Sequence, residues 1–455
     1  MFAEMFNHCR NLKSIDISNF TIRNDAYAYM MLAECSYLQT VNMGDNTFDN
    51  ANGLLYLSGR LSDLVYIRCT NTVKDKFVTQ SNFYGYNSSI MHCYTDNEEM
   101  PEYVPVQNDY YRSTDFSMNG KHKILQHATA GQGVDIVLYG DGYSDRLIAD
   151  GTYESVANKT MEAIFSMEPY KSYRHLFNVY LYYAVSVNEV IGRDTAFDTS
   201  LGTNENTSII GVINASAFDE ELLSITNKPF YKLACVGFVN NDSYHGSCEM
   251  VVSNGYEDYG NGRAYAWITA NHDEEQYRTT VLHEFGHGFA KLGDEYYLGP
   301  NTYTSADDLN WMHKCGFYMN LDTTSSSEDI LWSDFLKDTR YANSGLGVFE
   351  GGFAKYQYGI WRSTGNSIMN DNNTEYNVPS RKAIYNRIHK LAYGEGWQFD
   401  YETFVQQDLK NIPSQTKASP TKSAPYPARV NKTPFFKMEE SISSDGKKTI
   451  TVIMN

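Results

Sequence analysis

Two histidines four positions apart lie in the segment VLHEFGHGFAKLGDEYY, which covers residues 281–297. On a helix, His283 and His287 project from one face a single turn apart, so both imidazoles can reach one metal ion at about 2.0–2.1 Å. Glu284 follows the first histidine, and in this arrangement it accepts a proton from the metal-activated water. Chance gives only about 0.02 such motifs in a chain of this composition. The spacing therefore predicts a zinc-dependent hydrolytic site.

The third protein ligand is marked less clearly. In metzincin-type sites, a glycine stands seven residues and a ligand ten residues after the first histidine. Here Ala290 and Gly293 hold those positions. The first potential ligand beyond them is Asp294, which we favour, and Glu295 and His313 stay open as alternatives. Both acids could also be solvated residues at the end of the helix.

Further residues downstream could belong to the same site. The segment STGNSIMND, residues 363–371, contains Met369 in a Ser-x-Met turn of the kind that lies beneath metzincin zinc sites. Ordinary core filling is the alternative for this methionine. An oxyanion could be stabilised by a tyrosine and the substrate oriented by an arginine, although packing and structural salt bridges are the commoner roles of such residues. The candidates are Tyr296, Tyr297, Tyr376, Arg362 and Arg381.

The helix that carries both histidines is expected to begin after Asp273, whose capping partner is Gln276. Its buried stripe consists of apolar residues that recur every four positions: Tyr277, Val281, Phe285 and Phe289. At about 100 degrees per residue, the histidines lie about 200 degrees round from Val281, on the face turned away from this stripe. Gly293 is expected to end the helix, where the chain turns back toward the metal.

The surrounding segments indicate an α/β layer. Apolar runs predict strands, and a helix is expected at residues 153–167 between the first two of them. GDGYSD, residues 140–145, directly follows the first strand; it could cap a helix, which we favour, or hold a structural cation such as calcium. The expected strands cover residues 134–140, 177–187, 233–240 and 263–270.

Roughly the first hundred residues repeat with an offset of 26. CRNLKSIDI, CSYLQTVNM and LSDLVYIRC start at Cys9, Cys35 and Leu61, and one further step reaches Ile90 and Cys93. This period predicts a leucine-rich-repeat solenoid, in which each unit contributes one short strand and stacks on its neighbours. A helical hairpin is the alternative. The aligned positions are Leu12, Leu38 and Leu64, then Ile15, Val41 and Ile67.

The chain has 455 residues and a formal net charge of −18, which argues against nucleic acid or an anionic membrane as the main partner. No apolar run approaches the roughly 18 residues of a membrane-spanning helix. Seven cysteines without a C-x-x-C motif indicate neither a disulfide framework nor a thiolate zinc site, although Cys235 and Cys248 could pair.

We expect five segments along the chain. The repeats occupy residues 1–105, a connector residues 106–132, and the zinc peptidase domain residues 133–411. Residues 412–434 hold five of the eleven prolines and are interpreted as a linker. Residues 435–455 are expected to form a β-hairpin, with its turn at Asp445-Gly446.

Two resemblances support this division. MFNHCRNLKSIDISNF, residues 5–20, is similar to the bacterial surface-protein type of leucine-rich repeat. HEFGHGFAKLGDEYY, VDIVLYGDGYSD, FNVY and GIWRSTGNSIMND followed by RKAIYNRI resemble the bacterial IgA-peptidase family of zinc metalloendopeptidases, over about residues 125–400. Because Met1 falls inside a repeat and no signal peptide is present, we also expect upstream sequence that includes any export signal.

The second resemblance implies an extracellular or cell-surface endopeptidase with a metzincin-like fold and one catalytic zinc bound by the histidine pair. Its partner is a protein or peptide substrate, and the repeats would bind a host or extracellular protein. The competing hypothesis is a surface adhesin in which the repeats carry the function and the peptidase domain is inert.

Overall fold

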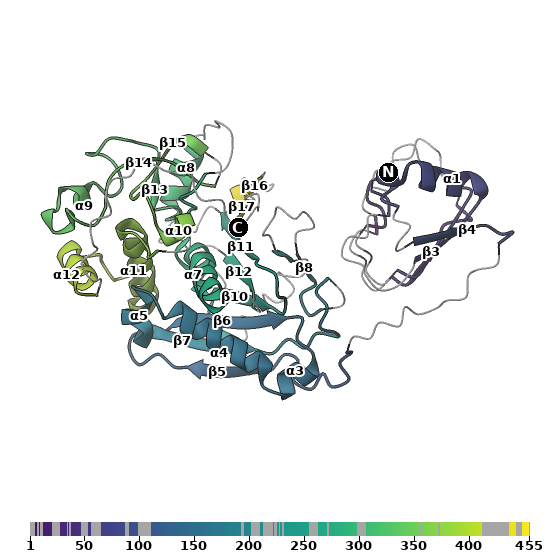
Figure 1. Ribbon diagram of the computed structural model, residues 1–455, viewed down its shortest axis with the longest axis horizontal. Helices are drawn as coiled ribbons and strands as arrows, with labels where there is room; N and C mark the ends of the chain where they lie inside the picture. The colour runs from purple at the N-terminus through teal and green to yellow at the C-terminus, as the bar shows by residue number, and fades with distance from the viewer. Residues whose placement is uncertain are drawn as a thin grey trace. The chain divides into compact units, whose positions relative to one another are not determined.

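The chain divides into two compact units, each described by itself below. One contains Met1–Arg112 with Gly192–Thr195, and the other contains Ser113–Ile191 with Ala196–Asn455 (Figure 1). The computed structural model describes residues 5–6, 9, 12–20, 28–33, 35, 38–46, 53–55, 65–86, 91–98, 111–192, 195–201, 210–212, 222, 225–226, 228–229, 232–253, 263–270, 273–297, 306–354, 356–371, 374–411, 436–442 and 448–454.

The first unit contains a parallel sheet with the order β1-β2-β3-β4. Its register pairs Ile15 with Val41, Val41 with Ile67, and Ile67 with Cys93, so neighbouring strands are 26 residues apart. The offset in the sequence is thus the offset of the strand register. The sheet is what the structure shows, and the identification of the units as leucine-rich repeats stays a prediction. The elements are β1 (Ser14–Asp16), β2 (Thr40–Gly44), β3 (Val65–Cys69), α1 (Asn71–Thr79), α2 (Ser81–Tyr84) and β4 (Met91–Tyr94).

The second unit is built around an eight-stranded mixed sheet with the order β16-β17-β11-β12-β10-β6-β7-β5. The neighbours β7, β6, β10 and β12 run parallel, whereas β5, β11, β17 and β16 each pair antiparallel. The strands are β5 (His122–Gln126), β6 (Val134–Asp141), β7 (Phe177–Tyr182), β10 (Ala234–Val239), β11 (Gly246–Ser253), β12 (Arg263–Thr269), β16 (Phe436–Ile442) and β17 (Lys448–Met454). The chain is therefore a mixed α/β protein.

Both faces of this sheet are covered, which explains why every residue of β6 is buried. Ile136 and Leu138 face one core, which they share with the helices α4 (Thr152–Ile164), α7 (Glu274–Ala290) and α11 (Val378–Tyr393). Val137 and Tyr139 face a second core on the opposite side. The antiparallel pair β8 (Thr199–Leu201) and β9 (Ile210–Val212) contributes to that second core.

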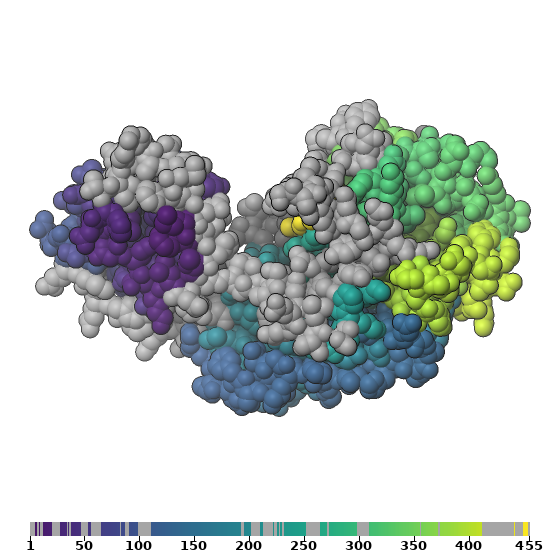
Figure 2. Space-filling model, turned by 180° about the vertical axis from the view of Figure 1, so that it is seen from behind, coloured from purple at the N-terminus to yellow at the C-terminus, as the bar shows by residue number. Residues whose placement is uncertain are grey.

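Shorter elements complete the second unit, including a three-stranded sheet with the order β13-β15-β14. Figure 2 shows the yellow-green α12 segment at the surface. The elements are α3 (Asp145–Ala149), α5 (Tyr170–Tyr173), η1 (Arg174–Leu176), α8 (Ala306–Lys314), β13 (Leu321–Asp322), α9 (Ser333–Lys337), η4 (Thr339–Tyr341), β14 (Phe349–Gly352), β15 (Tyr356–Arg362), α10 (Ile368–Asp371) and α12 (Tyr401–Asn411).

Several expectations can be compared with these elements. The strands expected at residues 134–140, 233–240 and 263–270 correspond to β6, β10 and β12, whereas the strand expected at 177–187 ends at Tyr182. Two expected strands at the C-terminus are present as β16 and β17, and both join the large sheet. The proline-rich segment 412–434, the Asp445-Gly446 turn, Leu64 and Ile90 lie outside the described residues.

Two cysteines that could have paired do not. Cys235 and Cys248 are not joined by a disulfide, and they belong to the cores on opposite faces of the sheet. Within the described ranges, none of the helices combines the length and apolar character needed to cross a membrane.

Candidate metal centre

Helix α7 begins as its sequence predicts. The side chain of Asp273 accepts hydrogen bonds from the backbone N–H groups of Glu275 and Gln276, at 3.0 and 3.1 Å. These bonds satisfy two of the donors that a helix leaves open at its N-terminus. The start of the helix, and with it the phase of the histidines, is therefore fixed by a local signal.

The end of α7 differs from the expectation. The helix ends at Ala290, and Lys291 adopts the left-handed conformation with φ 54°, so Gly293 is not the terminating residue. Gly293 is required for a different reason. A Cβ at this position would lie 2.6 Å from Cδ1 of Leu321 and 3.1 Å from Cδ1 of Tyr318. The glycine thus permits a close approach between the segment after the helix and residues 318–321.

The predicted buried stripe of α7 is confirmed, since Tyr277, Val281, Phe285 and Phe289 are at most 1% exposed. The opposite face was expected to point away from the interior, and here the expectation is wrong. His283 and His287 are 0% exposed. The sheet lies over one side of the helix and α10 and α11 over others, so α7 is buried all round from Thr279 to Ala290.

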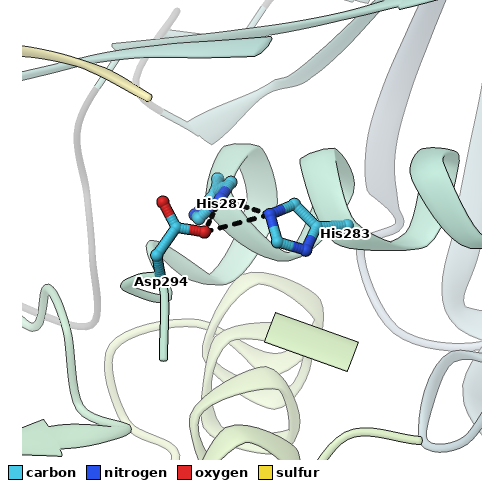
Figure 3. A group of neighbouring side chains, drawn as sticks. All are labelled: His283, His287 and Asp294. Atoms are coloured by element: carbon cyan, nitrogen blue, oxygen red, sulfur yellow. Dashed lines mark hydrogen bonds and ion pairs between the residues drawn. The ribbon is translucent and has the colours of Figure 1, made fainter. Parts of the chain in front are cut away.

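The two histidine rings and one carboxylate converge (Figure 3). The Nε2 atoms of His283 and His287 are 3.0 Å apart, and Oδ1 of Asp294 lies 3.1 and 3.3 Å from them. The Nδ1 atoms lie 2.8 and 2.6 Å from the carbonyl oxygens of Ile368 and Leu292. Because a carbonyl oxygen only accepts, each Nδ1 carries the proton in the neutral ring and each Nε2 presents a lone pair to the centre.

Asp294 reaches this centre because the left-handed turn at Lys291 reverses the chain directly after the helix. Asp294 is 0% exposed; its Oδ1 faces the Nε2 atoms of both histidines, and its Oδ2 has no hydrogen-bond partner among the described residues. The carboxylate therefore faces the two imidazole nitrogens and the space between the three side chains. Lone-pair atoms that converge without donors in a buried position fit a divalent cation, and two nitrogens with one oxygen fit zinc.

The electrostatics of the three residues lead to the same conclusion. Burial is the largest effect and lowers the pKa of His287, but the Asp294 carboxylate, the charge of Glu284 and the Leu292 carbonyl together bring the net pKa above the ordinary value. Burial raises the pKa of Asp294, yet the charge of His287 and hydrogen bonds from both histidines bring it well below the ordinary value. The Asp294 carboxylate is therefore ionised, and a positive charge beside it stabilises this buried negative charge. A bound cation supplies that charge without protonating an imidazole.

Glu284 lies between α7 and strand β11 and is 2% exposed. A Cβ at Gly246, the first residue of β11, would lie 2.7 Å from Oε1 of Glu284. Cys248 lies two residues further along β11, and its Sγ would be 3.7 Å from a Cβ placed at Gly288 of α7. Strand β11 therefore runs beside α7, and the missing side chain of Gly246 makes room for the Glu284 carboxylate. No pattern in the sequence marks this role of Gly246.

The two alternative third ligands lie elsewhere. Glu295 is fully buried, so it is not a solvated acid, and its carboxylate accepts hydrogen bonds from Asn320, Ser367 and Asn377 at 2.7–2.9 Å. His313 lies on α8, and burial lowers its pKa. In the part of the chain that the structure describes, the group of potential metal ligands consists of His283, His287 and Asp294, with ligand atoms within 4.8 Å of one another.

Met369 lies in α10 beneath the histidine helix and is fully buried. A Cβ at Gly286 would lie 2.9 Å from Sδ of Met369, so the sulfur packs directly against the helix backbone. The neighbouring backbone supports the centre. The Ile368 carbonyl accepts from His283, and the Met369 carbonyl accepts from the Glu295 N–H at 2.8 Å.

The tyrosine candidates occupy different environments. Tyr376 is fully buried, and its hydroxyl donates to the carbonyl of Leu282, which assigns it a packing contact with α7. Tyr296 is 3% exposed. Tyr297 is partly exposed and forms a parallel bridge with Ala354.

The arginine candidates are both engaged in structural contacts. Arg362 is 3% exposed and donates from Nη1 to the carbonyls of Glu350 and Gly351, at 2.7 and 2.5 Å. Arg381 forms a buried bidentate ion pair with Asp408, at 2.6 and 2.8 Å, which joins α11 to α12. These contacts hold β15 against β14 and α11 against α12.

The structural cation considered for residues 140–145 finds no support in the contacts there. The carboxylate of Asp141 accepts from the N–H groups of Phe197 and Thr199, both at 3.0 Å, and from the Thr199 hydroxyl at 2.6 Å. Asp145 accepts from the N–H groups of Thr114 and Asp115. Both carboxylates thus accept hydrogen bonds from N–H and hydroxyl groups of the protein itself.

Lys291 should make stability depend on pH. Burial, followed by the charge of Arg387, lowers the pKa of Lys291 from 10.5 to about 7. Between these values the unfolded chain binds a proton that the folded chain has lost, so the free energy of unfolding rises with pH, by at most about 1.4 kcal/mol per pH unit. Urea unfolding of the chelator-treated protein from pH 7 to 9 should show this slope, and Lys291→Met should reduce it by most of that amount. Equal slopes in the two proteins would contradict the assignment.

Comparison with known families locates this centre in a defined domain. Residues 123–341 match the family described as IgA Peptidase M64. The matched range runs from β5 to η4 and contains α7 and Asp294, but it ends before Met369 and does not reach the N-terminal unit. No curated protein matches the chain. The region is thus similar to the M64 peptidases, a family of zinc-dependent metallopeptidases.

Proposed function

We propose that the second unit is a zinc endopeptidase that hydrolyses peptide bonds of extracellular proteins. The convergence of His283, His287 and Asp294, with Glu284 one position along the same helix, is the observation that carries this proposal. The M64 match over residues 123–341 supports it independently.

In this proposal, His283 and His287 would hold zinc through Nε2 and Asp294 through its carboxylate. Zinc held there would supply Lewis-acid chemistry, with a lowered pKa of water toward about 7 and a polarised scissile carbonyl. Glu284 accepts the proton of the attacking water and delivers it to the leaving amine. The hydrogen bonds from Nδ1 to the carbonyls of Ile368 and Leu292 fix the orientation of both rings. Met369 is proposed as the methionine of the turn that supports the helix from below.

For the first unit we propose binding or targeting of a host or extracellular protein, with the whole chain located outside the cell or at its surface. The strand register with its 26-residue offset supports an array of stacked units. We further propose that these units are leucine-rich repeats.

A second candidate function is a surface adhesin whose peptidase domain is inert. One observation favours it. All three proposed ligands are 0% exposed and Glu284 is 2% exposed, so this conformation does not admit a protein substrate.

Metal analysis combined with a peptide assay distinguishes the two functions. We expect about one zinc per purified chain and cleavage of a quenched fluorescent peptide library. A chelator should abolish cleavage, and added zinc should restore it. Zinc binding to the folded state alone should also raise the melting temperature, by an amount that grows with the free zinc concentration. Bound zinc with no cleavage of any peptide favours the adhesin, and a chain that binds no zinc removes the peptidase proposal.

A further inference from the structure

The proposed active site has a defined border on the side of strand β11. Gly246 lies against the Glu284 carboxylate, and the strand continues beside α7 as far as Cys248 and beyond. One edge of β11 pairs with β12 in the interior of the sheet. A peptide whose scissile bond is to reach Glu284 in an extended form would add to the other edge of β11, because a strand edge supplies backbone donors and acceptors to an incoming chain.

That other edge is already occupied by the chain itself. Strand β17 pairs antiparallel with β11, from Ser253 opposite Thr449 to Cys248 opposite Met454 (Figure 1). Met454, at the C-terminal end of β17, is therefore the end of the strand nearer to Gly246, which lies beside Glu284. The strand approaches the proposed catalytic glutamate in the way that one half of an extended substrate would approach it.

The side chains of β17 bind as those of an extended peptide do. Ile450 and Val452 are 0% exposed and belong to the same core as the apolar residues of α7. Thr451 and Ile453, which alternate with them, are partly exposed. Main-chain pairing supplies affinity and the pockets for alternate side chains supply selectivity in such strand addition.

We propose that β17 is a substrate mimic that the protein carries within its own chain and that closes the active site by occupying the substrate edge of β11. This inference rests on the proposed peptidase function. It predicts that the burial of His283, His287 and Asp294 decreases when β17 leaves β11. It also predicts the substrate class, namely extended peptides with apolar residues at alternate positions, as in the sequence KTITVIM of β17.

The proposed contact between β17 and β11 is intramolecular, and this determines how strongly β17 competes with a substrate. A tethered strand acts at an effective concentration on the order of millimolar, so a substrate at micromolar concentration displaces it only when the strand has detached. The rate of cleavage is then limited by the fraction of molecules in which β17 is away from β11. Anything that locks the strand should switch the peptidase off, and anything that weakens its docking should raise activity.

A reversible cross-link tests the inference in the full-length chain. Val251 and Thr451 are directly opposite each other on β11 and β17, and both are partly exposed. Directly opposed residues lie within the range that a disulfide spans. The variant V251C/T451C should cleave the quenched peptides at least about 10-fold more slowly when oxidised than after reduction with a phosphine, at unchanged zinc content. The single variant Thr451→Cys, treated identically, should not respond.

A second variant weakens the docking instead of locking it. Val452→Asp places a carboxylate in the buried position of β17, which opposes docking, whereas Thr451→Asp places it on the partly exposed side. Val452→Asp should raise kcat/KM at least about 10-fold relative to Thr451→Asp. A free peptide KTITVIM should inhibit the Val452→Asp variant competitively, and a scrambled peptide should not.

The outcomes separate this inference from the proposal on which it rests. If the cross-linked protein, verified by mass, cleaves as fast as the reduced protein, β17 does not close the site and the peptidase proposal stands. If zinc is bound and neither form cleaves any peptide, the peptidase proposal fails and the substrate-mimic inference fails with it.

Discussion

Replacing Glu284 by glutamine is expected to lower kcat by about 10²–10⁴-fold, the contribution typical of a general base. Glutamine has nearly the same shape and fits beside Gly246, but its amide does not accept a proton at neutral pH. The two histidines and Asp294 keep their positions, since Glu284 is not among the converging ligands. Zinc content should therefore stay at about one per chain while turnover is lost.

A matched control for this variant lies on the same helix. Glu275→Gln changes a largely exposed carboxylate in the first turn of α7, where Glu275 pairs with Arg278. This surface pair contributes little, so activity and zinc content should equal those of the parent. If Glu284→Gln binds zinc and cleaves as fast as the parent, Glu284 is not the general base.

Much of the site was predictable because its signals are local. The start of α7 follows from the Asp273 cap, and the pairing of His283 with His287 follows from helical geometry alone. Asp294 was favoured because it was the first possible ligand beyond the helix, and the structure brings it to the two imidazoles. The same reasoning placed strands on β6, β10 and β12, since short apolar runs that end at turn residues are read directly from the sequence.

Features that depend on contacts distant in the sequence were not predictable. No residue near Gly293 in the sequence indicates that Leu321 packs closely against it, so Gly293 was interpreted as the end of the helix. No residue near His283 in the sequence indicates that its Nδ1 donates to the Ile368 carbonyl, because a backbone carbonyl can come from any residue. The burial of the histidine face was missed for the same reason.

The edges of the large sheet show this limit most clearly. Alternating residues on either side of an Asp-Gly turn predicted two strands at the C-terminus, and β16 and β17 pair antiparallel. The partner of β17 is β11, about two hundred residues earlier in the chain. A period-2 pattern identifies a strand but not the strand beside it. The N-terminal unit is the opposite case, because a fixed offset between similar segments also predicts which strands are neighbours.

Asp294→Asn is expected to weaken zinc binding by at least about 100-fold, since removing even a partner behind a metal ligand typically costs 10–100-fold in affinity. The carboxylate is the only anionic member of the group of ligands found in the described residues, and its charge is what a divalent ion in this buried position requires. Titration with a competing chelator measures the affinity, and cleavage should fall in parallel at limiting zinc.

The neighbouring acid provides the control that makes this test specific. Glu295→Gln replaces one carboxylate oxygen with an amide N–H that faces the donors of Asn320, Ser367 and Asn377. Its buried network should lose about 1–3 kcal/mol of stability. Zinc affinity should change far less than in Asp294→Asn, because Glu295 binds these side chains and not the centre. The opposite result, with zinc lost on changing Glu295 and retained on changing Asp294, would assign the third ligand to Glu295. The left-handed turn at Lys291 would then have to be rearranged in the metal-bound protein, since it is this turn that presents Asp294 to the histidines.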